Sequence, residues 1–366
     1  MPDQDLYTSA LCAWLANRKT QGGTLPNLRI NWERFVRAAA ESAVLPALSG
    51  QNSLERTVIC AVPEDVSAAL ILVNTLNAER NRTALVQAQQ LAAAMNQVGI
   101  QPVALKGLAN ILAGIYPDLG ARYLADIDLL VPPEDFPAAV AVLHNLSYSA
   151  YPAHSIEFVI GHSYPALTRA DSLEVDLHRT VGLGACASFL PATEVFRDSV
   201  PHNLDGASIR IPSPEHLVTH HIMHSQMHDS YRERINPSLR TLYDFFLLER
   251  HFHASLDWHA IEHRFRQKGQ YATFALFLIE VEQSFGLKPP IALSVSTPLK
   301  LRRRRRQLLQ SKPALRFLDP SYYFLAGVRP RTRRLREILA QPGCWQYLFQ
   351  KLYEPKFYAR LRHDLG

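Results

Sequence analysis

The sequence DIDLLV at residues 126–131 decides the predicted fold. Side chains alternate between the two faces of a β-strand, so Asp126, Asp128 and Leu130 share one face, whereas Ile127, Leu129 and Val131 occupy the other. Two neighbouring carboxylates above a buried face favour a bound cation between them, and magnesium prefers such oxygen ligands. The motif is weak by itself, because an edge strand with two solvated aspartates has the same pattern.

A second stretch, SLEVDLHR at residues 172–179, repeats the arrangement. Its alternation places Glu174, Asp176 and His178 on one face and apolar residues on the other. If the two strands are antiparallel neighbours in the sheet, Asp176 lies beside Asp126 and Asp128. Carboxylates that converge in this way form the two-metal sites used for phosphoryl or nucleotidyl transfer.

Upstream of both strands, Leu105-Lys106-Gly107 stands where a short strand at 103–105 gives way to a helix at 107–115. A glycine there allows close approach of a phosphate, and a helix N-terminus offers unpaired N–H groups. Lys106 and Arg122 add positive charge near the acidic strand. A Lys-Gly pair before a helix is common, and its value here comes from its position one helix before the acidic strand.

The hydrophobic pattern divides the chain into three parts. Residues 1–99 read as helical, including a long amphipathic helix at 63–98; residues 100–212 mix short strands with helices; and residues 213–366 return to helical periodicity. Further strands are predicted at 156–160, 163–169, 172–178 and 207–211, and further helices at 133–145, 236–253, 257–269 and 271–286. Ser213 is a plausible N-cap for the first helix of the third part.

This order of parts resembles the polymerase-β nucleotidyltransferase superfamily and, more narrowly, the bacterial "uncharacterised nucleotidyltransferase" family. The resemblance covers roughly residues 65–285 and rests on Leu105-Lys106-Gly107, Tyr116, Arg122, residues 126–131, residues 143–148, Val175-Asp176-Leu177-His178, Pro214-Glu215 with His224, Leu242-Tyr243-Asp244 and Asp257-Trp258. It implies an α+β fold in which a mixed sheet core is flanked by N-terminal helices and a C-terminal helical domain.

Carried over residue by residue, the resemblance implies that Asp126, Asp128 and Asp176 bind two magnesium ions and act in catalysis. Lys106, Gly107 and Arg122 would contact the triphosphate of an NTP, with ATP favoured, and the acceptor would be a hydroxyl group. Members of the family occur near peptide natural-product clusters, so the acceptor could be a peptide. Two alternatives stay open: transfer of the γ-phosphoryl group to a peptide such as a lasso-peptide precursor, and a non-catalytic adaptor that binds a peptide or nucleic acid.

Composition bears on partners and location. Residues 300–366 contain 17 Lys/Arg and four Asp/Glu, whereas the whole chain contains 39 Lys/Arg and 33 Asp/Glu. The C-terminal region, which includes the run Arg302–Arg306, is therefore basic, and the rest of the chain is acidic. This region would suit nucleic acid or an acidic peptide, or would be a solvated face.

Asp3 and Asp5 stand where a signal peptide carries positive charge, and no stretch is long and apolar enough to cross a membrane, so a cytoplasmic location is expected.

Histidines at 216, 220, 224 and 228 recur every four residues, with His221 beside them. Two histidines four apart on a helix can bind zinc, but no HExxH arrangement accompanies them, and ordinary packing is the better explanation. His224 could face the cleft. For Asp244, a salt bridge within the helical part is favoured over catalysis.

Overall fold

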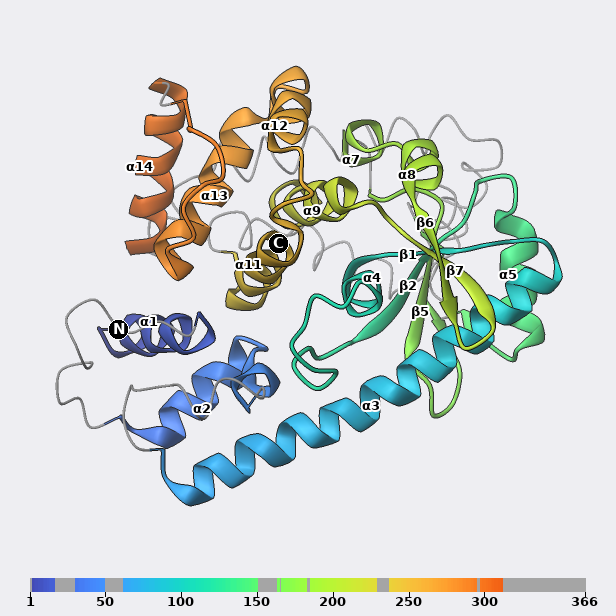
Figure 1. The fold of residues 1–366 in the computed structure, drawn as a ribbon, viewed down its shortest axis with the longest axis horizontal. Coiled ribbons are helices and arrows are strands. Elements are labelled where there is room, and N and C mark those ends of the chain that lie inside the picture. The colour runs from blue at the N-terminus through green and yellow to red at the C-terminus, as the bar shows by residue number, and fades with distance from the viewer. Residues whose placement is uncertain are drawn as a thin grey trace, which may run out of the picture.

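The computed structural model describes residues 2–16, 30–49, 62–150, 163–164, 166–182, 185–228, 237–294 and 297–311. Within these ranges the protein has a mixed α+β fold built on one seven-stranded sheet (Figure 1). The strands are β1 (Val103–Ala104), β2 (Asp126–Leu130), β3 (Ser149–Ala150), β4 (Leu167–Thr168), β5 (Glu174–His178), β6 (Val200–Leu204) and β7 (Ala207–Ile211).

The strand order is β3-β4-β5-β2-β1-β7-β6, which places the two acidic strands side by side near the middle. β2 and β5 run parallel, as do β1 and β7, whereas the other neighbouring pairs are antiparallel. Neither β2 nor β5 can be an edge strand, so the backbone groups of both are paired and the positions of their side chains are fixed.

Helices cover both faces of the sheet. They are α1 (Pro2–Leu15), α2 (Trp32–Glu41), η1 (Leu45–Ser49), α3 (Glu64–Gln97), α4 (Lys106–Leu112), α5 (Phe136–Asn145), α7 (Ala185–Phe189), α8 (Ala192–Asp198), α9 (Pro214–Met223), η2 (His224–His228), α11 (Leu239–Phe252), α12 (Trp258–Gln267), α13 (Tyr271–Phe285) and α14 (Thr297–Ser311). α3 and α5 lie on one side of the sheet, while α4 lies on the other, next to α9 and α11 (Figure 1).

The long helix α3 positions several loops through polar side chains. Gln87 accepts a hydrogen bond from the Leu173 amide and donates to the Leu173 carbonyl, which fixes the chain just before β5. Asn96 exchanges hydrogen bonds with the Ser208 backbone in β7 in the same way. Amides shielded from water and bonded to backbone are rigid connections, because leaving either group unpaired would be costly. α3 therefore holds β7 and the start of β5 in place.

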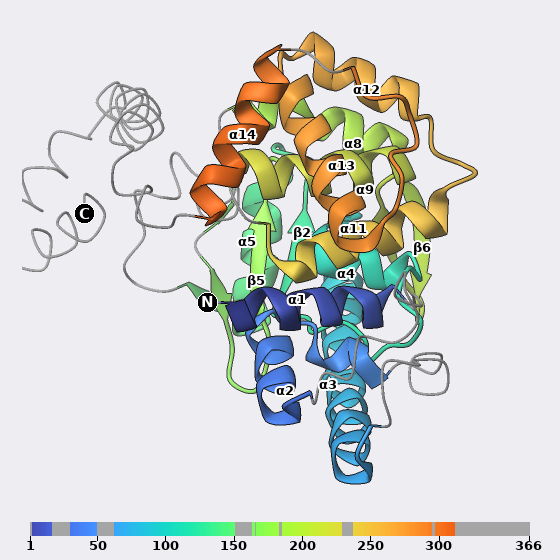
Figure 2. The same cartoon turned by 90° about the vertical axis from the view of Figure 1, so that its left-hand side faces the viewer.

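The N-terminal helices join the two halves of the molecule. α1 packs against both α11 and α13 and against α2, and Figure 2 shows it beneath the helices of the C-terminal half. The Trp14 indole donates a hydrogen bond to the Leu48 carbonyl and packs on Trp32 and Phe35. These contacts make the N-terminal region part of the main core rather than a separate appendage.

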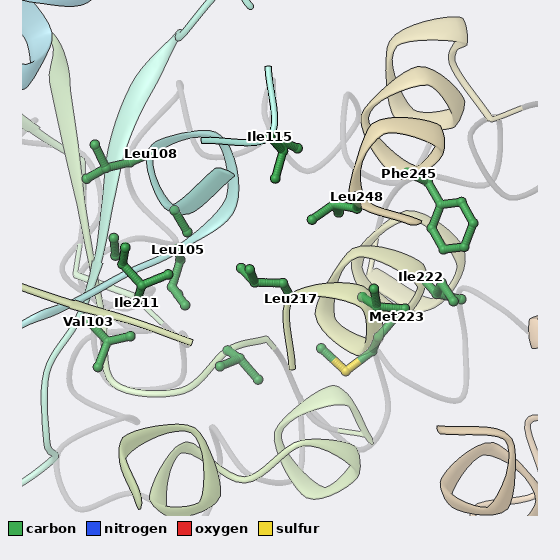
Figure 3. Packing of buried hydrophobic residues seen from close by; sticks show 14 of the residues in the cluster. Val103, Leu105, Leu108, Ile115, Ile211, Leu217, Ile222, Met223, Phe245 and Leu248 are labelled. Atoms are coloured by element: carbon green, nitrogen blue, oxygen red, sulfur yellow. The ribbon is translucent and has the colours of Figure 1, made fainter. Parts of the chain in front are cut away.

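The hydrophobic core is continuous from the sheet into the helical half. Figure 3 shows side chains of β1 and α4, including Val103 and Leu108, on one side, and side chains of α9 and α11, including Phe245 and Leu248, on the other. Leu217 lies between the two groups. This apolar contact fixes where α9 and α11 stand relative to the acidic strands.

The predicted fold class and most predicted elements are confirmed, including the helix at 63–98, the strands at 126–131 and 172–178, and the Ser213 cap, whose hydroxyl accepts from the His216 amide. The expectation of antiparallel acidic strands is wrong, because β2 and β5 are parallel. The predicted strand at 156–160 lies outside the described residues. The three-part division of the chain remains a prediction.

In the described ranges, no helix has the length and apolar character needed to cross a bilayer.

Candidate metal and nucleotide site

The acidic face of β2 lies directly beside that of β5. Their parallel register pairs Asp128 with Asp176, and Asp126 with Glu174. Because paired residues in a sheet point to the same face, the register brings the carboxylates of Asp126, Asp128 and Asp176 together above one patch of sheet. The alternation read from the sequence therefore holds, although the strands run in the other relative direction.

Asp128 is the centre of this cluster and is almost completely buried, at 1 % side-chain exposure. Its Oδ1 lies 2.6 Å from the Lys106 Nζ and 2.7 Å from the His178 Nε2. Burial alone would raise the pKa of Asp128, but the Lys106 ammonium and the His178 hydrogen bond outweigh it and hold that pKa well below its usual range. Asp128 is thus ionised and accepts from both neighbours, which makes His178 Nε2 the protonated ring nitrogen.

For Asp176 and Asp126, the same kinds of interaction change the pKa in the opposite direction. Burial, together with the negative charges of Asp128 and Asp126, raises the pKa of Asp176 to about 6. Burial and the charge of Asp128 likewise raise the pKa of Asp126. The face therefore holds more negative charge than Lys106 compensates, a condition that a divalent cation relieves.

The donor atoms present suit such a cation. Asp128, Asp176 and His178 each offer one ligand atom, and these atoms lie within 4.8 Å of one another. Carboxylate oxygens are the hard ligands that magnesium prefers. Asp126 is not a member of this closest group but extends the same acidic face by one position along β2. The described residues thus include a group that could hold a metal ion.

Asparagines of α3 hold the loop between α4 and β2 in place. Asn77 donates to the Gly120 carbonyl, and Asn81 donates to the carbonyls of Leu119 and Arg122. A Cβ on Gly120 would come within 2.4 Å of the Asn74 carbonyl oxygen, so only glycine allows the loop to approach α3 this closely. The loop is therefore pinned, and it presents Arg122 to the cluster.

Arg122 joins the core to the helical half. Its Nε lies 3.0 Å from Asp244 Oδ2 on α11, and the Tyr116 hydroxyl donates to the other oxygen of Asp244 at 2.9 Å. Burial would lower the pKa of Arg122, but Asp244 reverses this effect and raises it above its usual range. Asp244 does form a salt bridge, as expected, but to the core rather than within the helical half. We call these three residues the Arg122–Asp244–Tyr116 clasp.

A cavity of about 220 Å³ lies between the acidic strands and the helical half. Side chains from α4, the pinned loop, β2, α9, η2 and α11 line it: Lys106, Gly107, Asn110, Arg122, Leu124, Ala125, Asp126, Asp128, Leu217, His220, His221, His224, Ser225, Arg240, Thr241 and Asp244. The three predicted nucleotide contacts, Lys106, Gly107 and Arg122, thus line the same cavity as two of the three predicted metal ligands, Asp126 and Asp128. A Cβ on Gly107 would lie 2.8 Å from Leu124 Cδ1, so the glycine also permits close packing of α4 on the loop.

The histidine series serves mainly packing in the described part of the chain. His220 Nε2 lies 3.2 Å from the Val181 carbonyl and His221 Nε2 lies 2.8 Å from the Thr241 carbonyl, and burial lowers the pKa of both rings. No zinc-like group forms among the described histidines. His224 lines the cavity, as the sequence suggested it could.

Sequence reasoning missed two residues of the site. His178 was placed on the acidic face, but its bond to Asp128 could not be deduced, because it depends on the side-chain rotamers. Arg240 on α11 was not singled out at all, although it lines the cavity. The only sequence signal for Arg240 is its distance of four residues from Asp244, which places both on one helix face.

Comparison with known proteins agrees with this geometry. Residues 29–286 match the family described as "uncharacterised nucleotidyltransferase", which is most of the chain. The protein belongs to this nucleotidyltransferase family. Comparison with curated proteins gives no match.

Two solved structures also show some likeness. The antibiotic-resistance factor ANT(2'')-Ia, in a solution structure, has 15 % identity and a TM-score of 0.36, over 54 % of this chain and 97 % of its own. An antigenic nucleotidyltransferase-like protein from Paracoccidioides brasiliensis has 15 % identity and a TM-score of 0.34, over 57 % of this chain and 94 % of its own.

Proposed function

We propose that the protein transfers a nucleoside monophosphate from an NTP, with ATP favoured, to an acceptor hydroxyl on a peptide or small molecule. The observation that carries this proposal is the register of β2 and β5, which places Asp176 next to Asp128 and on the same face as Asp126. A cavity lined by Lys106 and Arg122 adjoins that face.

In this proposal Asp126, Asp128 and Asp176 hold two magnesium ions. When bound, these ions would neutralise the charge of the phosphates and make the α-phosphate more electrophilic. His178 and the paired backbone of β2 and β5 fix the orientation of Asp128, so the ligand set is organised before substrate arrives. Such preorganisation is the main contribution that a protein makes to phosphoryl and nucleotidyl transfer.

Lys106, Gly107 and Arg122 would contact the triphosphate, since all three line the cavity. Lys106 adopts a left-handed backbone with φ of 48°, which costs a non-glycine residue about 1–2 kcal/mol. The ion pair with Asp128 offsets this cost and keeps the ammonium at the acidic face. Strained residues of this kind cluster at functional sites.

In the proposed reaction, each bond that forms is matched by a bond that breaks. The acceptor oxygen forms a bond to the α-phosphorus, the bond from that phosphorus to the bridging oxygen breaks, and pyrophosphate leaves with the electron pair. The acceptor proton passes to the Asp176 carboxylate, whose raised pKa of about 6 suits it to accept a proton near neutral pH.

Transfer of label tests the proposal. Each of the four NTPs, labelled at the α- or the γ-phosphate, is incubated with magnesium and hydroxyl-bearing peptides, nucleic acids or small molecules. We expect the α-label to enter the acceptor with release of pyrophosphate, and Asp126→Ala to abolish this transfer without unfolding the protein. Entry of the γ-label would replace the proposal with a kinase reaction, and lack of any magnesium-dependent NTP binding in calorimetry would favour a non-catalytic adaptor.

A further inference from the structure

The cations that line the cavity differ in how their charges are compensated. The ammonium of Lys106 is 2.6 Å from Asp128, and the guanidinium of Arg122 is 3.0 Å from Asp244. Arg240, the third, forms no ion pair or hydrogen bond within the described part of the chain. Its charge therefore lacks the direct carboxylate partner that Lys106 and Arg122 each have.

The backbone around Arg240 holds it firmly. It is the second residue of α11, where the Ser238 hydroxyl accepts from the Thr241 amide and caps the helix. Asp244 follows four residues later, so the helix face that joins Arg122 in the clasp also carries Arg240. The clasp thereby fixes where the Arg240 side chain enters the cavity.

Keeping an arginine in this place is unfavourable in the absence of a ligand. Burial, followed by the positive charge of Arg122, lowers the pKa of Arg240 below its usual range. The carboxylates of Asp244 and Asp126, which also line the cavity, act on this pKa in the opposite direction but do not outweigh burial. Partly buried charges that lack a partner destabilise a fold and are typical of positions that bind an oppositely charged ligand.

We propose that Arg240 binds the polyphosphate chain of the nucleotide from the α11 side of the cavity, while the acidic strands hold the metal-facing side. This inference rests on the proposed function and names a fourth contact for its nucleotide. A guanidinium forms paired, planar hydrogen bonds to phosphate oxygens, which suits this role. The cavity, at about 220 Å³, is smaller than the roughly 300–1,000 Å³ typical of pockets that enclose a whole drug-sized ligand, so it suits the phosphates, with the nucleoside extending outward.

The test compares two identical substitutions on one helix. Arg240→Met removes the cavity cation, whereas Arg250→Met removes an exposed arginine that packs over Phe246 at the other end of α11. Binding of inorganic tripolyphosphate and of each NTP, both with magnesium, is measured by calorimetry. Tripolyphosphate serves as a probe that is independent of the base.

We expect Arg240→Met to weaken the binding of tripolyphosphate and of the preferred NTP by about 10- to 100-fold, the effect of losing charged hydrogen bonds. Arg250→Met should bind as the wild type does. Arg240→Lys should bind with an affinity between those of Arg240→Met and the wild type, because lysine keeps the charge but lacks the planar pair of donors. Thermal unfolding without ligand should give Arg240→Met a melting temperature equal to or above that of the wild type, a result that a purely structural arginine would not give.

The outcomes separate this inference from the proposed function. If the wild type binds an NTP and Arg240→Met binds it equally well, the role of Arg240 is wrong while the proposed reaction stands. If the wild type binds neither tripolyphosphate nor any NTP with magnesium, both are wrong. A fall in the melting temperature of both Arg240→Met and Arg240→Lys, without a loss of binding, would assign Arg240 to the fold.

Discussion

Asp176 pairs with Asp128 across two neighbouring strands, and its carboxyl group holds a proton more tightly than an ordinary aspartate does. Alternation along each strand was enough to predict that these side chains share a face. The distance between the Asp128 and Asp176 carboxylates was not predictable, because it depends on the register of the two strands. Their unequal pKa values were not predictable either, because these also depend on Lys106 and His178. At the residue scale, the sequence therefore identified the chemistry and the fold supplied its electrostatics.

The raised pKa of Asp176 predicts a dependence of stability on pH. The folded protein without metal binds this proton more tightly than the unfolded chain, whose value is near 3.8, so its stability rises as the pH falls through about 6. Asp176→Asn lacks this titration. The melting temperature of the wild type minus that of the variant should therefore increase as the pH falls through 6 in EDTA. A difference that stays flat over this range would show that folding does not raise the pKa of Asp176. A difference that still increases with saturating magnesium and nucleotide would show that no metal binds at Asp176.

Lys106 predicts a second effect at this scale. Its ammonium contacts the same Asp128 oxygen that we propose as a metal ligand, so it competes with the metal when no nucleotide is present. Lys106→Met should bind Mn²⁺ about tenfold more tightly without nucleotide, in line with the loss of one charged hydrogen bond, as measured by electron paramagnetic resonance. The same variant should bind the metal–NTP complex more weakly. Weaker binding of the metal alone would mean that Lys106 supports the ion rather than replacing it.

At the scale of elements, the strongest sequence signals were the long periodic helix and the two acidic strands. The edge strand β6 was missed because Pro201 makes its sequence untypical of a strand, although an edge position tolerates proline. β3 has only two residues, which leaves no pattern to read. The parallel direction of β2 and β5 was also not predictable, because direction depends on how the intervening β3 and β4 are inserted in the sheet.

The clasp is a nearly buried ion pair that connects the loop before β2 with α11. Arg122 and Asp244 have side-chain exposures of 13 % and 6 %, so either one left alone would be a nearly buried charge. Arg122→Met and Asp244→Leu should each lower the free energy of unfolding by about 3–5 kcal/mol. The double variant should lose clearly less than the sum of the two, which denaturant unfolding of all four proteins would measure. Additive losses would show that the two side chains are not coupled.

At the scale of the whole molecule, the sequence suggested a uniform basic region from Arg302 to Arg306. The structure divides it, because residues 302–305 are exposed whereas Arg306 is buried. Arg306 donates to Gln226 on η2 at 2.7 Å and lies 3.6 Å from Glu280 on α13, so it attaches α14 to the helical half. A run of identical residues gives no sign of which member is buried. Binding of nucleic acid or an acidic peptide by this region stays a prediction, and most of the region lies beyond the described residues.

This division gives a matched pair of variants. Arg306→Ala should lower the free energy of unfolding by about 1.5–3 kcal/mol, the range for buried hydrogen bonds to a charged group. Arg303→Ala, three residues earlier and exposed, should change it by less than about 0.5 kcal/mol. Both values come from denaturant unfolding. Equal effects of the two substitutions would remove the attachment that we assign to Arg306.

The most direct test of the account is a titration of Mn²⁺ with the preferred NTP, followed by electron paramagnetic resonance. Wild-type protein and Glu174→Gln, which changes an acidic neighbour on the same face, should bind the metal tightly and to a similar extent. Asp126→Asn, Asp128→Asn and Asp176→Asn should each lose most of that binding while remaining folded. Metal binding that survives undiminished in the three aspartate variants would contradict the site on which the proposed reaction depends.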